Sequence, residues 1–282
     1  MSTSVIVATY NSPESLRKTL LGLTVQTHAD FETIVADDGS GPETELVLRK
    51  RAFRSLGIRH LWQPDYGWRK PRLLNWAIAE CQSDYIIFMD GDMIPRADFV
   101  ESHLRERRPG TYISASRVHV PEIVHPRFTD DDILNNRVFD VRELAKLEPK
   151  MRKQRTRLHP LWPAALNLLT YRPNVFMGCN ASAWREDLLA VNGYDEEYGY
   201  GSEDRDLGIR LTNSGCRSRW LKFSLIMLHL KHPIKLDEEQ LRRNRQRLKI
   251  AKSTRRAWTE IGIDTVAERI AEEITGTSLR VA

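Results

Sequence analysis

The feature that most constrains the fold is an apolar segment that runs directly into two aspartates, at residues 84–92 (DYIIFMDGD). Residues 85–89 predict a buried strand, because such strands are short, continuous apolar runs. In an open α/β sheet, ligands bind outside the carboxyl ends of the strands. Asp90 and Asp92 would offer hard oxygen ligands at that edge, suited to Mg²⁺ or Mn²⁺. The alternative for an isolated Asp-Gly-Asp is a turn between two elements.

Apolar runs alternate with helical patterns through the first third of the chain, which predicts a parallel sheet with crossover helices. The predicted strands cover residues 4–9, 31–36, 58–62 and 85–89. The predicted helices begin after Ser12 and cover residues 42–56 and 72–81. Ser12 is expected to cap the first helix, with Pro13 at its first position. The fold class is therefore α/β.

The pattern is looser in the rest of the chain. A charged, proline-containing insertion at residues 125–173 has only patchy helical character. Strands are predicted at 111–118, 217–223 and 225–230, and helices at 184–191 and 204–213. From residue 237 onward the sequence is polar and helical, with expected docking points at Leu241, Leu248, Ile250 and Trp258.

Length and composition permit one large domain or two small ones, since 282 residues with 41% hydrophobic content can bury a sizeable core. No run approaches the roughly 18 apolar residues that a membrane-spanning helix needs, and the amino terminus lacks the pattern of a signal peptide. We therefore expect a cytoplasmic location. Cys81, Cys179 and Cys216 have no CxxC spacing, so reduced core cysteines are expected rather than disulfides or a zinc site.

The net charge of +5, from 43 basic and 38 acidic residues, is unevenly placed. One basic stretch contains Lys146, Lys150, Arg152, Lys153, Arg155 and Arg157, and the other contains Arg242, Arg243, Arg245, Arg247, Lys249, Lys252, Arg255 and Arg256. Such runs are usually solvated helix faces, and the functional alternative is contact with an anionic membrane or an acidic glycan. No nucleic-acid-binding motif accompanies the charge, so nucleic acid is not an expected partner.

Several separated motifs occur together with the Asp-Gly-Asp segment. They are VIVATYNS at 5–12, IVADDGS at 34–40, WQPDYGWRKPRLLN at 62–75, MGCNAS at 177–182, GYGSEDRDL at 199–207 and LHLKHP at 228–233. In this order they resemble the GT-A glycosyltransferases of family 2. The segment from Met177 to Leu207 is similar to the carboxyl-terminal signature of the β-galactosyltransferase and N-acetylgalactosaminyltransferase group.

This resemblance implies a GT-A catalytic domain at residues 1–233 and a helical extension at 234–282. Residues 1–120 would bind the nucleotide sugar, and residues 121–233, with the insertion, would form the acceptor half. Asp37 and Asp38 can accept hydrogen bonds from a uracil edge and ribose hydroxyls, or can simply form the turn before Gly39. The resemblance makes Asp37 the base contact, and Thr9 would line the same pocket.

Cations and amides cluster where the predicted helix at 72–81 begins. Arg69, Lys70, Arg72 and Asn75 can meet ribose and phosphate oxygens there, although a solvated cationic turn is the alternative. The resemblance favours Arg72 and Asn75 on the donor side, and Asp65 as a sugar or pocket contact.

The resemblance also implies a metal site. Asp90 and Gly91 would lie against the donor, and Asp92 would bind Mn²⁺ or Mg²⁺ that neutralises the diphosphate. Histidines three residues apart point to opposite faces of a strand, so only one of His229 and His232 is expected to coordinate. The match to the His-Leu-x-His-Pro ending of the family favours His229.

Glu203 and Asp204 follow a glycine-containing loop, where Ser202 can cap a helix whose first turn suits acidic residues. The resemblance assigns this pair to the acceptor, with Asp204 as the base in an inverting single displacement. Trp184, Tyr198 and Tyr200 could stack on an acceptor ring or fill the core.

The predicted function is metal-dependent, inverting transfer of a hexose or N-acetylhexosamine from a UDP-sugar to a glycan or glycolipid. Two alternatives come from other classes. A sugar-nucleotide pyrophosphorylase would have the same kind of nucleotide-binding sheet. Its glycine-rich activating loop, however, is missing near the amino terminus of this sequence. A noncatalytic glycan-binding module would not require the set Asp90, Asp92, Asp204 and His229.

Overall fold

The first part of the chain alternates strands and helices as predicted. The structure, a computed structural model, describes residues 1–148, 162–170, 174–233, 237–266, 268–270 and 272. Its first elements are β1 (Thr3–Thr9), α1 (Pro13–Thr24), β2 (Glu32–Asp37), α2 (Pro42–Leu48), η1 (Arg51–Leu56), β3 (Arg59–Trp62), α3 (Lys70–Glu80) and β4 (Tyr85–Asp90). The four strands lie within two residues of their predicted bounds. The predicted helix at 42–56 is divided into α2 and the 3₁₀ helix η1, which ends at Gly57 in the left-handed region (φ 53°).

The later elements differ more from the prediction. They are β5 (Met93–Ile94), α4 (Phe99–Glu106), β6 (Thr111–Val120), η2 (His125–Arg127), α5 (Asp130–Leu134), η3 (Arg137–Phe139), α6 (Val141–Leu147), α8 (Pro163–Leu169), β7 (Asn180–Trp184), α9 (Arg185–Ala190), α10 (Glu203–Asn213), β8 (Arg217–Leu230), α11 (Glu238–Thr254) and η5 (Ile263–Thr265). The two predicted strands at 217–230 are one long strand, β8, whose pairing with β6 shifts register between Ala115 and Ser116. Strand β7 was not predicted. The basic residues from Lys150 to Arg157 lie outside the described residues.

The strands form one sheet in the order β3-β2-β1-β4-β7-β6-β8-β5. Strands β1, β2, β3 and β4 are parallel neighbours, whereas β7 is antiparallel to both β4 and β6. Strand β5 pairs antiparallel with the end of β8, so that Met93 lies opposite His229. The segment that follows β4 therefore lies beside the carboxyl end of β8.

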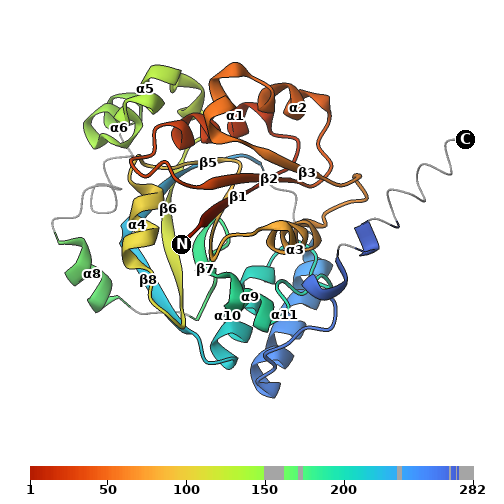
Figure 1. Ribbon diagram of the computed structural model, residues 1–282. Coiled ribbons are helices and arrows are strands. Elements are labelled where there is room, and N and C mark those ends of the chain that lie inside the picture. Colours follow the sequence, from red (N-terminus) through yellow and green to blue (C-terminus); the bar gives the residue numbers. More distant parts are fainter. Residues whose placement is uncertain (149–161, 171–173, 234–236, 267, 271, 273–282) are drawn as a thin grey trace, which may run out of the picture.

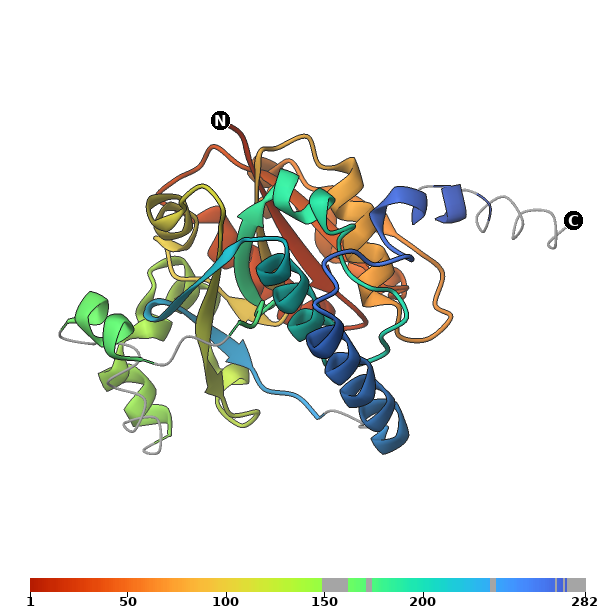
Figure 2. The same cartoon turned by 90° about the horizontal axis from the view of Figure 1, so that it is seen from below.

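Both faces of the sheet are covered by helices, as Figure 1 and Figure 2 show. Alternate residues of β1 belong to two different cores: Val5 and Val7 pack with α1, and Ile6 and Ala8 pack with α3. This two-sided burial explains why the strands read as continuous apolar runs in the sequence.

Two predicted helix caps are wrong. Neither Ser12 nor Ser202 makes a side-chain cap hydrogen bond, and Ser202 has a left-handed backbone (φ 80°).

At the carboxyl-terminal side, α11 packs against α10 and buries Leu248. Ile250 and Trp258 are exposed, so they are not docking points. Among the residues that the structure describes, no helix is both long and apolar enough to cross a bilayer.

Candidate active site

A cavity of about 240 Å³ lies at the carboxyl ends of β1, β2 and β4. It brings together eight candidate residues from the sequence: Thr9, Asp38, Lys70, Asp90, Gly91, Asp92, Tyr200 and His232. Six further residues complete its lining: Ala8, Tyr10, Ser12, Ala36, Trp68 and Leu73. A concave site with a few convergent polar groups at this edge of an α/β sheet is typical of ligand binding.

The turn after β4 packs directly on β1. The backbone N–H of Gly91 donates to the carbonyl of Ala8 at 2.7 Å, and a Cβ at Gly91 would lie 3.0 Å from Oγ1 of Thr9. Only glycine allows so close an approach without displacing Thr9. Within the part of the chain that the structure describes, the buried Thr9 hydroxyl has no hydrogen-bond partner, so a ligand in the cavity could satisfy it.

Asp90 and Asp92 have different partners. Nζ of Lys70, at the start of α3, donates to Oδ1 of Asp90 at 2.5 Å. Oδ2 of Asp92 lies 3.0 Å from Nε2 of His229 and 3.1 Å from Nε2 of His232. Burial alone would raise the pKa of Asp92, but its contacts with the two histidines hold that pKa well below the usual range. The same contact raises the pKa of His232 to about 9.

The arrangement of Asp92, His229 and His232 fits a divalent metal. Their ligand atoms all lie within 4.8 Å of one another, and no described residue forms a hydrogen bond with the buried Oδ1 of Asp92. The carboxylate suits Mg²⁺ or Mn²⁺, and the two imidazoles add softer nitrogen ligands that other first-row divalent metals also accept. The expectation that only one histidine reaches the site is wrong, because β8 ends at Leu230 and His232 lies beyond the strand.

His119 on β6 stands next to this cluster. Its Nδ1 lies 2.7 Å from Nδ1 of His229, which leaves Nε2 of His229 directed at Asp92. A hydrogen bond to the second ring nitrogen fixes the tautomer of a metal-binding histidine. His119, which lies one residue beyond the predicted strand at 111–118, is missed by sequence reasoning because its pairing with His229 of β8 is a long-range contact.

The carboxylates after β2 are held by the protein. Asp37 accepts from the backbone N–H of Ser40 at 2.8 Å and contacts Nε2 of His60 at 3.1 Å, and it lines a second cavity beside the first. Asp38 accepts from Nε2 of Gln63 at 2.5 Å and from the backbone N–H of Arg69 at 2.8 Å. Both side chains are nearly fully buried, and burial raises the pKa of Asp38.

Asp65 and Arg69 lie in the loop before α3. Asp65 accepts from the hydroxyl of Tyr10 at 2.8 Å, which ties the loop to the rim of the cavity. Arg69 donates from Nη2 to the carbonyl of Pro64 at 2.5 Å and stacks over Tyr66. Neither side chain lines the main cavity.

The structure contradicts the donor-side placement of Arg72 and Asn75. Arg72 donates to the carbonyl of Arg269 at 3.1 Å and does not line the cavity. Asn75 is fully buried, accepts from the N–H of Tyr194 at 2.7 Å and donates to the carbonyl of that residue at 2.9 Å. Its amide therefore holds the segment after α9 rather than a ligand.

Glu203 and Asp204 open α10 close to Lys70. Burial raises the pKa of both carboxyls. After burial, the strongest influence on Glu203 is the negative charge of Asp204, whereas for Asp204 it is the positive charge of Lys70. Asp204 is therefore the member that holds the negative charge and Glu203 the member that holds the proton. Oε2 of Glu203 and Oδ1 of Asp204 are buried, and neither has a hydrogen-bond partner among the described residues.

Glycine is required opposite Asp204. A Cβ at Gly178 would lie 2.4 Å from Oδ1 of Asp204, so the segment before β7 passes against this carboxylate.

Arg117 of β6 donates to Sγ of Cys179 at 3.0 Å and adds positive charge near Asp90 and Asp92. No sequence pattern selects Arg117, because a single arginine in a strand carries no local signal.

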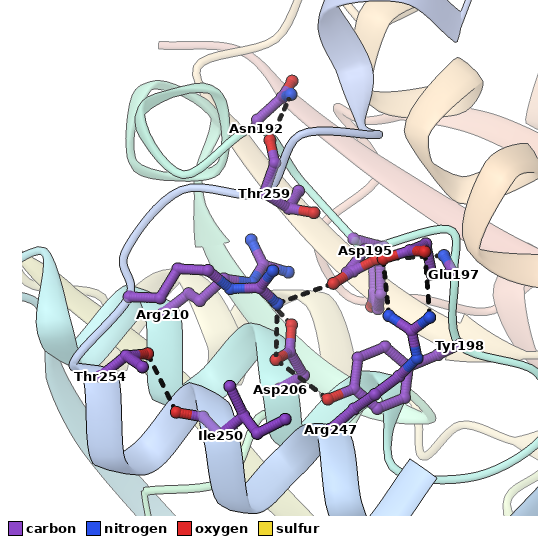
Figure 3. Close-up of polar contacts among 12 residues, drawn as sticks. Asn192, Asp195, Glu197, Tyr198, Asp206, Arg210, Arg247, Ile250, Thr254 and Thr259 are labelled. Atoms are coloured by element: carbon purple, nitrogen blue, oxygen red, sulfur yellow. Dashed lines mark hydrogen bonds and ion pairs between the residues drawn. The ribbon is translucent and has the colours of Figure 1, made fainter. Parts of the chain in front are cut away.

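Of the three aromatic residues predicted to stack on an acceptor, only Tyr200 lines the cavity, where it meets Trp68 edge to face at 5.8 Å. Tyr198 is buried and directs its hydroxyl to Asp206 at 3.2 Å (Figure 3). Trp184 pairs with Tyr85 at the amino end of β4, five residues before Asp90, or about 17 Å along the strand. The structure therefore places Trp184 away from the cavity, and Tyr198 takes the alternative role of a core residue.

Family models match nearly the whole described sheet. The model of glycosyl transferase family 2 matches residues 4–165, which is more than half of the chain. The model described as the N-terminal domain of galactosyltransferase matches residues 165–233.

Among curated proteins, the chain is 28% identical to chondroitin synthase of Escherichia coli over 77% of its own length and 33% of that protein. It is 29% identical to validoxylamine A glucosyltransferase of Streptomyces hygroscopicus subsp. jinggangensis, over 75% of the chain and 51% of the relative. The chain thus spans between a third and a half of the length of these two relatives.

Solved structures establish the fold. Staphylococcus aureus TarS has a TM-score of 0.61 at 14% identity, covering 97% of this chain and 43% of TarS. A mannosyltransferase from Pyrobaculum calidifontis, in complex with GDP-Man and Mn²⁺, has a TM-score of 0.58 at 14% identity over 98% of this chain and 75% of its own. The predicted GT-A fold is confirmed, and the chain belongs to glycosyl transferase family 2.

Proposed function

We propose that this protein is a metal-dependent, inverting glycosyltransferase that moves a hexose or N-acetylhexosamine from a UDP-sugar to a glycan or glycolipid. The observation that carries the proposal is the pairing of two groups near one cavity. Asp92, His229 and His232 form a cluster suited to a metal, and the buried pair Glu203 and Asp204 lies within electrostatic range of Lys70 and Asp90.

The choice of donor is supported by the residues that line the cavity and by the ligands of the structurally similar proteins. TarS has been solved with UDP and with UDP-GlcNAc, and the Pyrobaculum enzyme with GDP-Man and Mn²⁺. A nucleoside diphosphate sugar presents a diphosphate that needs cations close by, and the cavity offers Lys70 beside the metal-binding cluster. UDP-galactose, UDP-glucose and their N-acetylhexosamine relatives are the donors that we propose.

Each site residue has a part in this proposal. Asp92, His229 and His232 would hold Mn²⁺ or Mg²⁺, which, when bound, supplies Lewis-acid stabilisation of charge on the leaving diphosphate. Lys70 holds Asp90 in place and keeps positive charge beside the donor phosphates. Asp204 would accept the proton of the attacking hydroxyl, and Glu203, which keeps its proton, would donate a hydrogen bond to the acceptor. A base opposite the leaving group implies inversion.

The acceptor is proposed from Tyr200 and the relatives. Tyr200 and Trp68 form an aromatic rim on which a sugar ring can rest. The relatives named chondroitin synthase and hyaluronan synthase are enzymes of glycan polymers, which supports a glycan or glycolipid acceptor.

The test is release of UDP from UDP-glucose, UDP-galactose and their N-acetylated forms, with Mn²⁺ and with a chelator. We expect metal-dependent release that needs no pyrophosphate, and loss of release in Asp204→Asn. A pyrophosphorylase would require pyrophosphate or a sugar phosphate, and a noncatalytic module would release no UDP. Either result would overturn the proposal.

A further inference from the structure

Helix α11 carries one fully buried polar side chain, Asn244. A buried amide destabilises a protein unless it is hydrogen-bonded. Nδ2 of Asn244 faces three successive backbone carbonyls, those of Gly199 at 3.3 Å, Tyr200 at 3.0 Å and Gly201 at 2.5 Å. Its Oδ1 accepts from Gln240 one helical turn earlier at 3.0 Å. The N–H donors of the amide are therefore directed at the loop formed by residues 199–202.

This loop has little structure of its own. Gly201 and Ser202 both have left-handed backbones, with φ values of 89° and 80°, and the Ser202 side chain does not cap α10. A non-glycine residue in this region is strained and depends on its surroundings. The loop nevertheless carries Tyr200 at the cavity and leads directly into Glu203. Its conformation determines where both side chains point.

Ion pairs fix α11 to the same region. Arg247 makes two contacts with Glu197, at 2.6 and 2.9 Å, and Arg256 contacts Asp195 at 2.7 Å and Asp206 at 3.5 Å. Figure 3 shows Arg247 and Glu197 facing each other beside Tyr198 and Asp206. These contacts join α11 and the residues after it to segments before and after the loop. They therefore fix the position of Asn244 relative to the three carbonyls.

We infer that Asn244 is a positioning residue, which holds the loop 199–202 so that Tyr200 lines the cavity and Glu203 lies beside Asp204 and Lys70. Helix α11 is then a functional part of the acceptor side of the site and not an appendage to the catalytic domain. This inference has two tests. The test of enzyme activity rests on the proposed function, whereas the test of loop conformation does not.

The conformational test compares hydrogen exchange in the full chain and in Asn244→Asp. The substitution keeps the shape of the side chain but replaces its two N–H donors by an acceptor that faces carbonyls. We expect amides of residues 199–203 to exchange about tenfold faster, because the loop opens locally. Arg245→Ala, an exposed neighbour on the same helix, should leave that exchange unchanged. If Asn244→Asp does not fold, Asn244→Ser, which keeps one donor, should give a smaller increase in the same amides.

The activity test is a double-mutant cycle on UDP release from UDP-glucose with Mn²⁺. Asn244→Asp and Tyr200→Ala should each lower the rate by about tenfold, and the double variant should be little slower than either one, because both act through one loop. Additive effects, unchanged exchange at residues 199–203, or faster exchange throughout the chain would each overturn the inference. If the unmodified chain releases no UDP from any UDP-sugar, the proposed function fails, and the exchange comparison still decides the role of Asn244.

Discussion

Lys70 and Asp90 join the start of α3 to the end of β4 through a contact of 2.5 Å between Nζ and Oδ1. Burial alone would lower the pKa of Lys70, but the carboxyls of Asp90, Asp204 and Glu203 raise it. Lys70 therefore stays charged. Its positive charge is shared by the carboxyls of Asp90, Asp204 and Glu203.

Replacing Lys70 by methionine should shift the pH dependence of the reaction. Lys70 lowers the pKa of Asp204, whose burial has raised it above the ordinary carboxyl range of about 4. A base with a raised pKa works above that pKa and loses its function as the pH falls through it. Without Lys70 the pKa of Asp204 rises further, so the acid limb of the rate should move to higher pH. The measurement is UDP release between about pH 5 and pH 9, so that the acid limb of the rate lies within the measured range.

The matched control is Lys249→Met, which removes an exposed lysine on α11. It should leave the pH profile unchanged. An unshifted acid limb in a folded Lys70→Met variant would show that Lys70 does not set the charge of Asp204.

Asp92→Asn, His229→Ala and His232→Ala should each weaken the Mn²⁺ dependence of UDP binding. Each removes one candidate ligand, and we expect losses of about tenfold or more in metal affinity. Calorimetric titration of UDP with and without Mn²⁺ measures the effect. His28→Ala is the control, since His28 precedes β2 at the opposite end of the sheet. Wild-type metal dependence in all three variants would contradict the metal site.

Asp206→Asn should destabilise the protein. Asp206 and Arg210 form an ion pair of 2.6 Å with both side chains fully buried, and removing one partner of such a pair costs about 3–5 kcal/mol of unfolding free energy. Urea unfolding measures this. Glu239→Gln breaks an exposed pair with Arg243 and should change stability by no more than about 0.5 kcal/mol. Equal stability of the two variants would contradict the structural role of Asp206.

The first four strands and the main cavity are predictable from the sequence for a physical reason. Strands buried on both faces appear as apolar runs, and parallel strands place their following residues at one edge. Thr9, Asp38, Asp90 and Asp92 therefore come together in the structure as expected.

The contacts that complete the site are long-range, and local patterns do not encode them. Strand β7 is made of small and polar residues with no strand signal, and only its register against β4 places Trp184 away from the site. Asn75 lies near the predicted helix start, but the side of α3 on which it sits faces Tyr194. His232 reaches Asp92 because β8 ends two residues earlier, which periodicity does not reveal.

Contact with an anionic membrane stays a prediction for the basic stretch on α11. Arg247 and Arg256 are engaged in ion pairs with the protein, whereas Arg242, Arg245 and Lys249 are exposed at helical spacing. Cosedimentation with vesicles should increase with the fraction of acidic lipid and decrease with salt. Reversing these three charges to glutamate should abolish it, and reversing Lys50, Arg51 and Arg54 should not. Equal recovery with neutral and acidic vesicles would leave a solvated helix face.

Asp204→Asn separates catalysis from binding at one position. Asparagine keeps the size of the side chain and most of its hydrogen bonding but cannot accept a proton from the attacking hydroxyl, so transfer should fall by roughly 10²–10⁴. UDP affinity should barely change, because Asp204 does not belong to the metal-binding cluster.

Glu203→Gln is the informative comparison for Asp204→Asn. Glu203 holds its proton at neutral pH because burial and the charge of Asp204 raise its pKa. The amide of glutamine can replace that donor, so the maximal rate should stay within about tenfold, and the altered donor geometry should appear as a higher KM for the acceptor. Transfer rates at saturating donor and acceptor, measured beside UDP affinity, distinguish the two roles. Near-normal turnover in a folded Asp204→Asn, together with a collapse of the rate in Glu203→Gln, would assign the base to Glu203 instead.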